Sequence, residues 1–199
     1  MSDRPPGSID LKSMSTRDRL SVEAARLFAE RGYHGTSIGD LADALGIRKA
    51  SVYSHIKGKE DLLVEIALAG ANAFHTALAG VPTDADPEER LRLALRAHLG
   101  VVAGQLDVAT VWLQEWRFLT GPARQEFLTE RRRYERRIRT LFEDAVKAKV
   151  LRSDLDVKRA VLVFFSIANW AYTWMTTRTT VEQEADAFWS LLVEGMARG

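Results

Sequence analysis

The sequence predicts an all-α fold of about nine helices, and three observations support that prediction. Apolar residues recur at helical spacing along almost the whole chain, and no segment alternates apolar and polar residues in the manner of a half-buried strand. Helix signals bound the segments, since Asp86 followed by Pro87 is a typical start and Gly32 and Gly46 are typical ends. The chain has no low-complexity tract and is 46% apolar, which favours a packed core.

The expected helices form a group of three short ones near the N-terminus and a group of longer ones. We predict helices at residues 16–31, 37–45, 48–56, 59–78, from 87 onward, 107–119, 123–149, 157–176 and 181–197. The first group defines a domain at residues 15–60, and the second defines a larger helical domain at residues 61–199. Residues 1–14 are expected to be a disordered tail without a secretory signal, and Met14 is a candidate alternative start.

Composition excludes several classes of protein. The formal net charge of +1 gives no overall attraction to nucleic acid or anionic membrane, so such a role must come from local patterning. The absence of cysteine excludes disulfides and thiolate metal sites and fits a cytoplasmic protein. The most apolar run, residues 160–175, is shorter than the roughly 20 residues of a membrane span, so we expect a buried helix and no membrane partner.

No catalytic or metal-binding pattern is present. The four histidines, at positions 34, 55, 75 and 98, lack the paired spacing of metal ligands. Neither a nucleophile motif nor a phosphate-binding loop occurs. We therefore predict neither an enzyme, nor a metal site, nor a cofactor.

The stretch "SIGDLADALGIRKASVYSHIKGKEDLL", residues 37–63, changes character halfway along. Its first half carries Asp40 and Asp43, whereas residues 44–59 contain no acid. Two short helices joined at Gly46 are typical of a helix-turn-helix, in which the second helix enters the major groove. Its outward side chains donate hydrogen bonds to phosphates or base edges, and an acid there would repel phosphate. These outward residues are Arg48, Lys49, Ser51, Tyr53 and His55.

Two flanking residues are further candidates for phosphate contact. Lys59 begins the next helix, where its ammonium and the free N–H groups of the helix start can hold one phosphate. Thr36 precedes the first short helix and is of the residue types that cap helices, so it is a candidate cap that also reaches a phosphate.

The segment "AARLFAERGYHGTSIGDLADALGIRKASVYSHIKGKEDLL" resembles the DNA-binding domain of the TetR family of transcriptional repressors. The resemblance includes the elements "LFAERGY", "TSI..LA..LGI" and "SVY.HI..KE.LL", and departs from the family at Ile56, where Phe is usual. It implies that Tyr53, His55 and Lys59 touch phosphates, and that Arg48, Lys49, Ala50 and Ser51 face the major groove. It also implies a homodimer whose last two helices form a four-helix bundle, bound to a palindromic double-stranded operator.

The C-terminal helices support a homodimer independently. Residues 157–176 are apolar nearly all round, which is more than the surface helix of a monomer requires. The final helix adds Phe188, Leu191, Leu192 and Met196. Both helices could instead be ordinary core helices.

Aromatic residues in the larger domain indicate either bulky packing or a cavity for a small-molecule effector. "WLQEWRFL" supplies Trp112, Trp116 and Phe118, and "NWAYTW" supplies Asn169, Trp170 and Trp174. His98 lies on the apolar face of its helix and is either a core histidine or a contact for a ligand head group.

An arginine on an apolar helix face is the third clue to a ligand. Arg131 lies on the same stripe as Phe127 and Tyr134, and a buried guanidinium needs an anionic partner. That partner is either Glu135 or Glu115, or an anion on the ligand. In the latter case Arg132, Arg133, Arg136 and Arg137 would line a basic entrance; otherwise they form a solvated helix face.

The pattern "EWRFL…R..YE" followed by "NW..TW" resembles the branch of the family that represses fatty-acid or steroid degradation and responds to acyl-CoA thioesters; Met175 replaces the usual Tyr. This resemblance implies a long-chain acyl-CoA effector that tilts the helix at residues 59–78 and separates the two recognition helices. The alternatives are a drug or other apolar cation, as in multidrug-efflux regulators, and a ligand-independent regulator.

Overall fold

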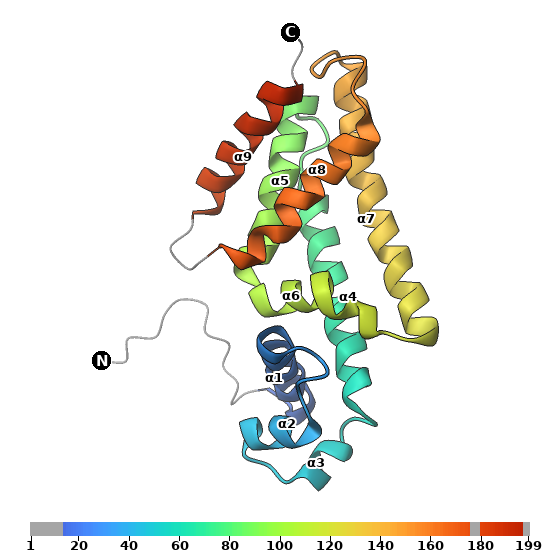
Figure 1. Ribbon diagram of the computed structural model, residues 1–199, viewed down its shortest axis with the longest axis vertical. Coiled ribbons are helices and arrows are strands. Elements are labelled where there is room, and N and C mark those ends of the chain that lie inside the picture. Colours follow the sequence, from blue (N-terminus) through green and yellow to red (C-terminus); the bar gives the residue numbers. More distant parts are fainter. Residues whose placement is uncertain (1–13, 176–179, 197–199) are drawn as a thin grey trace, which may run out of the picture.

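The computed structural model describes residues 14–175 and 180–196, and over these residues the all-α prediction is confirmed (Figure 1). The α-helices are α1 (Thr16–Arg31), α2 (Ile38–Leu45), α3 (Lys49–Tyr53), α4 (Lys59–Ala79), α5 (Pro87–Gly104), α6 (Leu106–Gln114), α7 (Gly121–Lys147), α8 (Val157–Trp170) and α9 (Val181–Met196). Two 3-10 helices, η1 (Glu115–Phe118) and η2 (Ala171–Thr173), follow α6 and α8. The tail predicted for residues 1–14 lies outside the described residues except for Met14.

The three N-terminal helices gather at one end of the molecule (Figure 1). Ser37 rather than Thr36 caps α2: its side chain accepts from the backbone N–H of Asp40, whose carboxylate accepts from the N–H of Ser37 in return. Gly46 ends α2 in the left-handed conformation at φ 65°, a region that glycine adopts without steric cost. The second helix of the motif is shorter than the predicted 48–56, because α3 ends at Tyr53 and Arg48 stands at its N-cap.

Two predicted helices each end in a tighter 3-10 turn. The helix expected at 107–119 divides into α6 and η1, and the one expected at 157–176 divides into α8 and η2. Residues 176–179, on which the end of the second prediction falls, lie outside the described residues. The change of helix type rotates the following side chains relative to a continuous α-helix. This rotation matters for two predicted ligand contacts, Phe118 and Trp174.

Helix α4 connects the two groups of helices and packs against α1, α5, α6 and α7. In the described part of the chain it is the helix long and apolar enough to cross a membrane by length and composition. A core helix passes the same test, and residues such as Leu63, Ile66 and Phe74 are buried inside the protein. The 160–175 run was predicted to be a buried helix, and this is corrected in part, because Leu162, Val163 and Trp170 are exposed.

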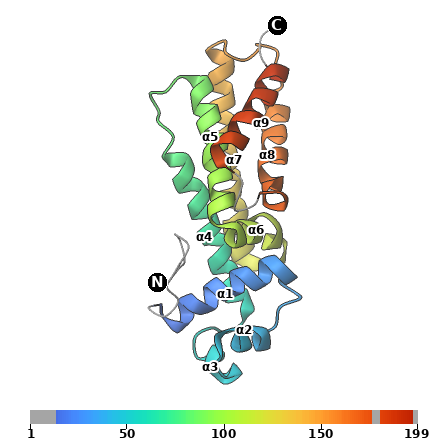
Figure 2. The same ribbon diagram turned by 90° about the vertical axis from the view of Figure 1, so that its left-hand side faces the viewer.

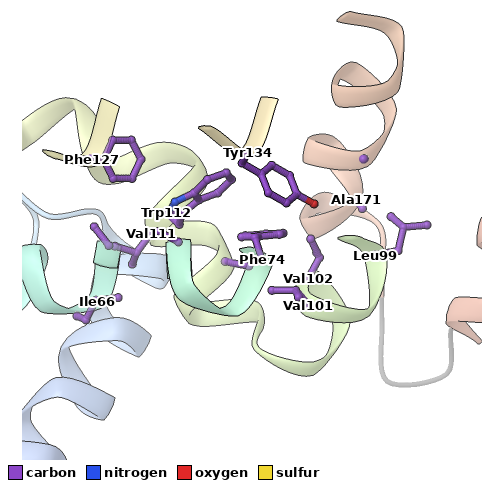
Figure 3. Packing of buried hydrophobic residues seen from close by; sticks show 14 of the residues in the cluster. Ile66, Phe74, Leu99, Val101, Val102, Val111, Trp112, Phe127, Tyr134 and Ala171 are labelled. Atoms are coloured by element: carbon purple, nitrogen blue, oxygen red, sulfur yellow. The ribbon is translucent and has the colours of Figure 1, made fainter. Parts of the chain in front are cut away.

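The larger domain is built around α5, with α4 on one side and α8 and α9 on the other (Figure 2). α9 packs on α5, and α8 packs on α7. The apolar stripe predicted for α7 is buried at Phe127, Tyr134, Ile138, Leu141 and Ala145. Figure 3 shows the centre of this core, where the rings of Phe74, Trp112, Phe127 and Tyr134 lie together.

Candidate functional site

The helix-turn-helix presents an exposed polar surface around α3. The side chains of α3 and its two ends that were expected to face DNA are exposed, whereas Val52 and Ile56 point into the core. Tyr53 is 52% exposed although it is aromatic. The exposed set is Arg48, Lys49, Ala50, Ser51, Tyr53 and His55. This surface can offer guanidinium, ammonium, hydroxyl and imidazole groups to a nucleic acid without a neighbouring acid on α3.

Lys59 is placed differently from the expectation. Its ammonium donates to the backbone carbonyls of Tyr33 at 2.6 Å and Thr36 at 2.9 Å, and it lies 4.2 Å from the centre of the Tyr33 ring. Partial burial lowers the pKa of the Lys59 ammonium from its usual value. Two of the three N–H groups of the ammonium therefore hold the loop between α1 and α2.

Thr36 is a correction to the predicted DNA-contact set. Its side chain is buried, and its hydroxyl lies 3.2 Å from the carbonyl oxygen of Leu27 and 3.1 Å from that of Gly32. The hydroxyl therefore ties the loop before α2 to the end of α1 and faces away from solvent.

Arg17 is a residue of this end of the molecule that sequence reasoning missed. Its guanidinium donates to the carbonyl oxygen of His55 at 2.6 Å and pairs with Glu65 of α4 at 2.9 Å. Arg17 thus connects three parts of the chain: α1, α4 and the segment that follows α3. The sequence contains no local signal for this contact, because the partners are 38 and 48 residues away.

A cavity of about 640 Å³ opens between α7 and α8. Five residues predicted to contact a ligand line it, namely Trp112, Arg131, Tyr134, Asn169 and Trp170. The other lining residues, which sequence reasoning did not assign to the site, are Glu135, Arg139, Lys158, Val161, Leu162, Phe165 and Ser166. The size is within the range of small-molecule sites.

The charged rim of the cavity is formed by a row of side chains on α7 and by Lys158 of α8. The row on α7 consists of Arg131, Glu135 and Arg139, at four-residue spacing on one helix face. Arg131 pairs with Glu135 at 3.3 Å. In the described part of the chain no acid pairs with Arg139 or Lys158, so the rim carries an excess of positive charge. The four arginines proposed as an entrance are not among the lining residues.

His98 lies behind the cavity wall, not in it. It is fully buried against the rings of Phe74, Phe164 and Phe165, and its Nδ1 is 3.1 Å from the hydroxyl of Tyr134. Burial lowers the pKa of His98 to about 3 and raises that of Tyr134. His98 is therefore neutral at pH 7 and orients Tyr134, whose ring lines the cavity.

Three predicted aromatic contacts lie outside the cavity lining. Trp116 stacks on Phe127 with ring centres 5.5 Å apart. Phe118 points to the helix-turn-helix, 5.8 Å from the Tyr33 ring, because η1 turns it away from the face of α6. Trp174 packs on Phe188 of α9 at 5.3 Å, since α8 ends at Trp170 and the two tryptophans do not share a helix face.

Known regulatory proteins share the sequence pattern of both domains. A model of "Bacterial regulatory proteins, tetR family" matches residues 22–66, and one of "Tetracyclin repressor-like, C-terminal domain" matches residues 84–196. The HTH-type transcriptional repressor KstR2 of Rhodococcus jostii is 29% identical over 97% of both chains. The fatty acid metabolism regulator protein of Bacillus subtilis is 24% identical over 76% of this chain and 79% of its own.

Solved structures show the same architecture. PfmR, a TetR family transcriptional regulator of Thermus thermophilus, superposes with a TM-score of 0.82 and 34% identity, covering 94% of this chain and 100% of its own. AibR in complex with isovaleryl coenzyme A and operator DNA has a TM-score of 0.79 and 31% identity, covering 88% of this chain and 96% of its own.

Proposed function

The chain belongs to the TetR family of transcriptional regulators, which are not enzymes, and we propose that it is a repressor whose effector is an acyl-CoA thioester. The observation that carries this proposal is the cavity between α7 and α8, which combines an aromatic floor with unpaired cations at its rim. The apolar acyl chain would lie against Phe165 and Trp170, and the phosphates of the coenzyme would meet Arg139 and Lys158. The complex of AibR with isovaleryl coenzyme A supports this ligand class.

The geometry favours an anionic ligand over a cationic drug. Recognition of an apolar cation is favoured by acids as well as aromatic rings in the pocket. Glu115, the acid that the sequence placed nearest the tryptophans, is turned to the backbone of Tyr33, and Glu135 is paired with Arg131. No observation specifically favours the multidrug or the ligand-independent alternative.

A homodimer on a palindromic operator completes the proposal, with residues 15–60 as the DNA-binding domain and residues 61–199 as the ligand-binding and dimerisation domain. Large apolar side chains are exposed on the last two helices: Leu162 is 59% exposed and Leu191 is 67% exposed. Exposed apolar side chains on the two consecutive C-terminal helices are typical of a protein interface. The boundary within α4 remains a prediction.

Replacing Lys49 with alanine should weaken operator binding, reduce the preference for the operator over unrelated DNA and lower the slope of log affinity against log salt, because a cation facing base edges in the major groove is lost. The side chain is exposed at the start of α3, so the fold should tolerate the change. Lys147→Ala, at the far end of α7, makes the same change in charge and is the control. Fluorescence anisotropy over a salt series measures the affinity and its salt slope for both variants. Equal effects of the two substitutions would contradict the placement of α3 against DNA.

The effector is tested by a gel shift on DNA from upstream of the protein's own gene. Acyl-CoA thioesters of increasing chain length should release the DNA, whereas the free acids and free CoA should not. Arg139→Ala should weaken release about tenfold or more, because one charge-assisted contact to phosphate is lost. Arg159→Ala, on an exposed arginine of α8 outside this cavity, controls for charge. Indifference of the wild-type complex to every thioester would overturn the effector.

A further inference from the structure

The loop between α1 and α2 is held from two sides by groups of opposite charge. Oε2 of Glu115, in η1, accepts the backbone N–H of Tyr33 at 2.7 Å. From the other side, the Lys59 ammonium donates to the carbonyls of Tyr33 and Thr36. The peptide groups of this loop are thus clamped between the larger domain and the start of α4.

The buried carboxylate of Glu115 depends on its hydrogen bond from the Tyr33 N–H. Its side chain is 7% exposed, and a carboxylate so buried requires strong hydrogen bonds to offset its lost hydration. Its other partner, Arg117, is 3.5 Å away and 58% exposed, which makes it a weak one. Of the two contacts, the hydrogen bond from the Tyr33 N–H is the short and buried one.

The same 3-10 helix touches the wall of the ligand cavity. Trp116 follows Glu115 directly and stacks on Phe127 of α7. The Arg131 guanidinium lies 5.2 Å from the centre of the Trp116 ring, and Arg131 lines the cavity. One four-residue segment therefore carries a contact to the DNA-binding domain and a contact to a cavity cation.

We propose that Glu115 is the positioning residue that holds the helix-turn-helix in its DNA-binding arrangement, and that ligand binding releases it. An anionic ligand that draws Arg131 off Trp116 would move η1 and lengthen the bond from Glu115 to the Tyr33 N–H. The loop would then lose its buried bond to the larger domain, and the helices on either side of it would shift relative to α6 and α4, on which α1 packs. This inference rests on the proposed function, since it concerns how that same cavity is coupled to DNA binding.

The test is a thermodynamic cycle with Glu115→Ala. Operator affinity is measured by anisotropy with and without the acyl-CoA that releases the wild-type protein best. We expect about a tenfold loss of affinity in the ligand-free protein, the scale of one buried charged hydrogen bond. With ligand bound, wild type and variant should bind DNA equally, because the contact is already open. A loss of equal size in both states, or no loss in either, would overturn the role of Glu115.

Three further measurements separate coupling from general damage. Glu115→Gln retains a carbonyl acceptor for the Tyr33 N–H and should restore most of the coupling, whereas Glu126→Ala removes an exposed acid and should leave it unchanged. Should the alanine variant fail to fold, Glu115→Asp, shorter by one methylene, replaces it. Amide hydrogen exchange at Tyr33 should rise in Glu115→Ala; unaltered protection would also overturn the proposal. If no thioester releases DNA from the wild-type protein, the proposed effector is wrong. Amide hydrogen exchange at Tyr33 and operator affinity without ligand then still decide the role of Glu115.

Discussion

Gly70→Ala is expected to lower the free energy of unfolding by about 1–3 kcal/mol, the usual cost of overpacking a core. A Cβ added at Gly70 of α4 would lie 2.7 Å from the Cβ of Trp112 and 3.0 Å from its Cγ. These atoms are close to the α6 backbone, and the Trp112 ring is fixed against Phe74 at 4.4 Å between ring centres. Helices α4 and α6 must therefore move apart, which outweighs the gain in helix propensity of at most about 1 kcal/mol.

Gly100→Ala is the matched control for this substitution. Gly100 is also inside a helix, α5, but a Cβ there would meet no atom within 4 Å among the described residues. Its substitution should raise stability by up to about 1 kcal/mol. Urea denaturation of both variants measures the difference. Equal stability of the two would show that the contact between α4 and α6 is looser than the structure indicates.

Acid should destabilise the protein through His98, and His98→Gln should remove that part of the effect. The folded-state pKa of His98 is lowered to about 3, whereas an unfolded histidine titrates near its ordinary value. The unfolded chain therefore binds more protons below about pH 6.5, so the stabilisation is complete above that pH and is lost as the pH falls towards 3. Between pH 8 and pH 5 the loss amounts to about 2 kcal/mol.

The measurement is the stability of wild type and His98→Gln by urea denaturation from pH 8 to pH 4.5. Glutamine does not titrate and can still bond the Tyr134 hydroxyl, so the other groups that titrate in this range cancel in the difference between the two proteins. That difference should narrow by about 2 kcal/mol from pH 8 to pH 5. A constant difference over the series would mean that His98 can take up a proton inside the folded protein.

Features set by neighbours in the chain could be predicted from the sequence. The span of α1, the start of α5 at Pro87 and the buried stripe of α7 follow from caps and apolar spacing, which act within a few residues. Exposure of the α3 side chains followed from the same spacing. The exceptions were the end of α3, which stops at Tyr53, and the ends of α6 and α8, where a 3-10 turn replaced the last α-helical turn.

The candidate site could be predicted only in part, because a face is a local property and its partner is not. Spacing placed Arg131, Tyr134 and Trp170 on helix faces, and these residues do line the cavity. Arg139 and Lys158 repeat that spacing, but their role depended on α7 and α8 lying against each other. Nothing in the sequence distinguished Arg139 or Lys158 from the other exposed cations of these helices.

The sequence by itself determined the all-α fold, the helix-turn-helix and the polar surface of α3, because these depend on hydrophobic periodicity, capping and local charge. Only the tertiary structure decided the direction of Lys59, Thr36 and Glu115, all of which bond the backbone around the loop between α1 and α2. A buried polar side chain bonds the unsatisfied peptide group that folding brings to it, and the Tyr33 N–H is 82 residues from Glu115 in the chain.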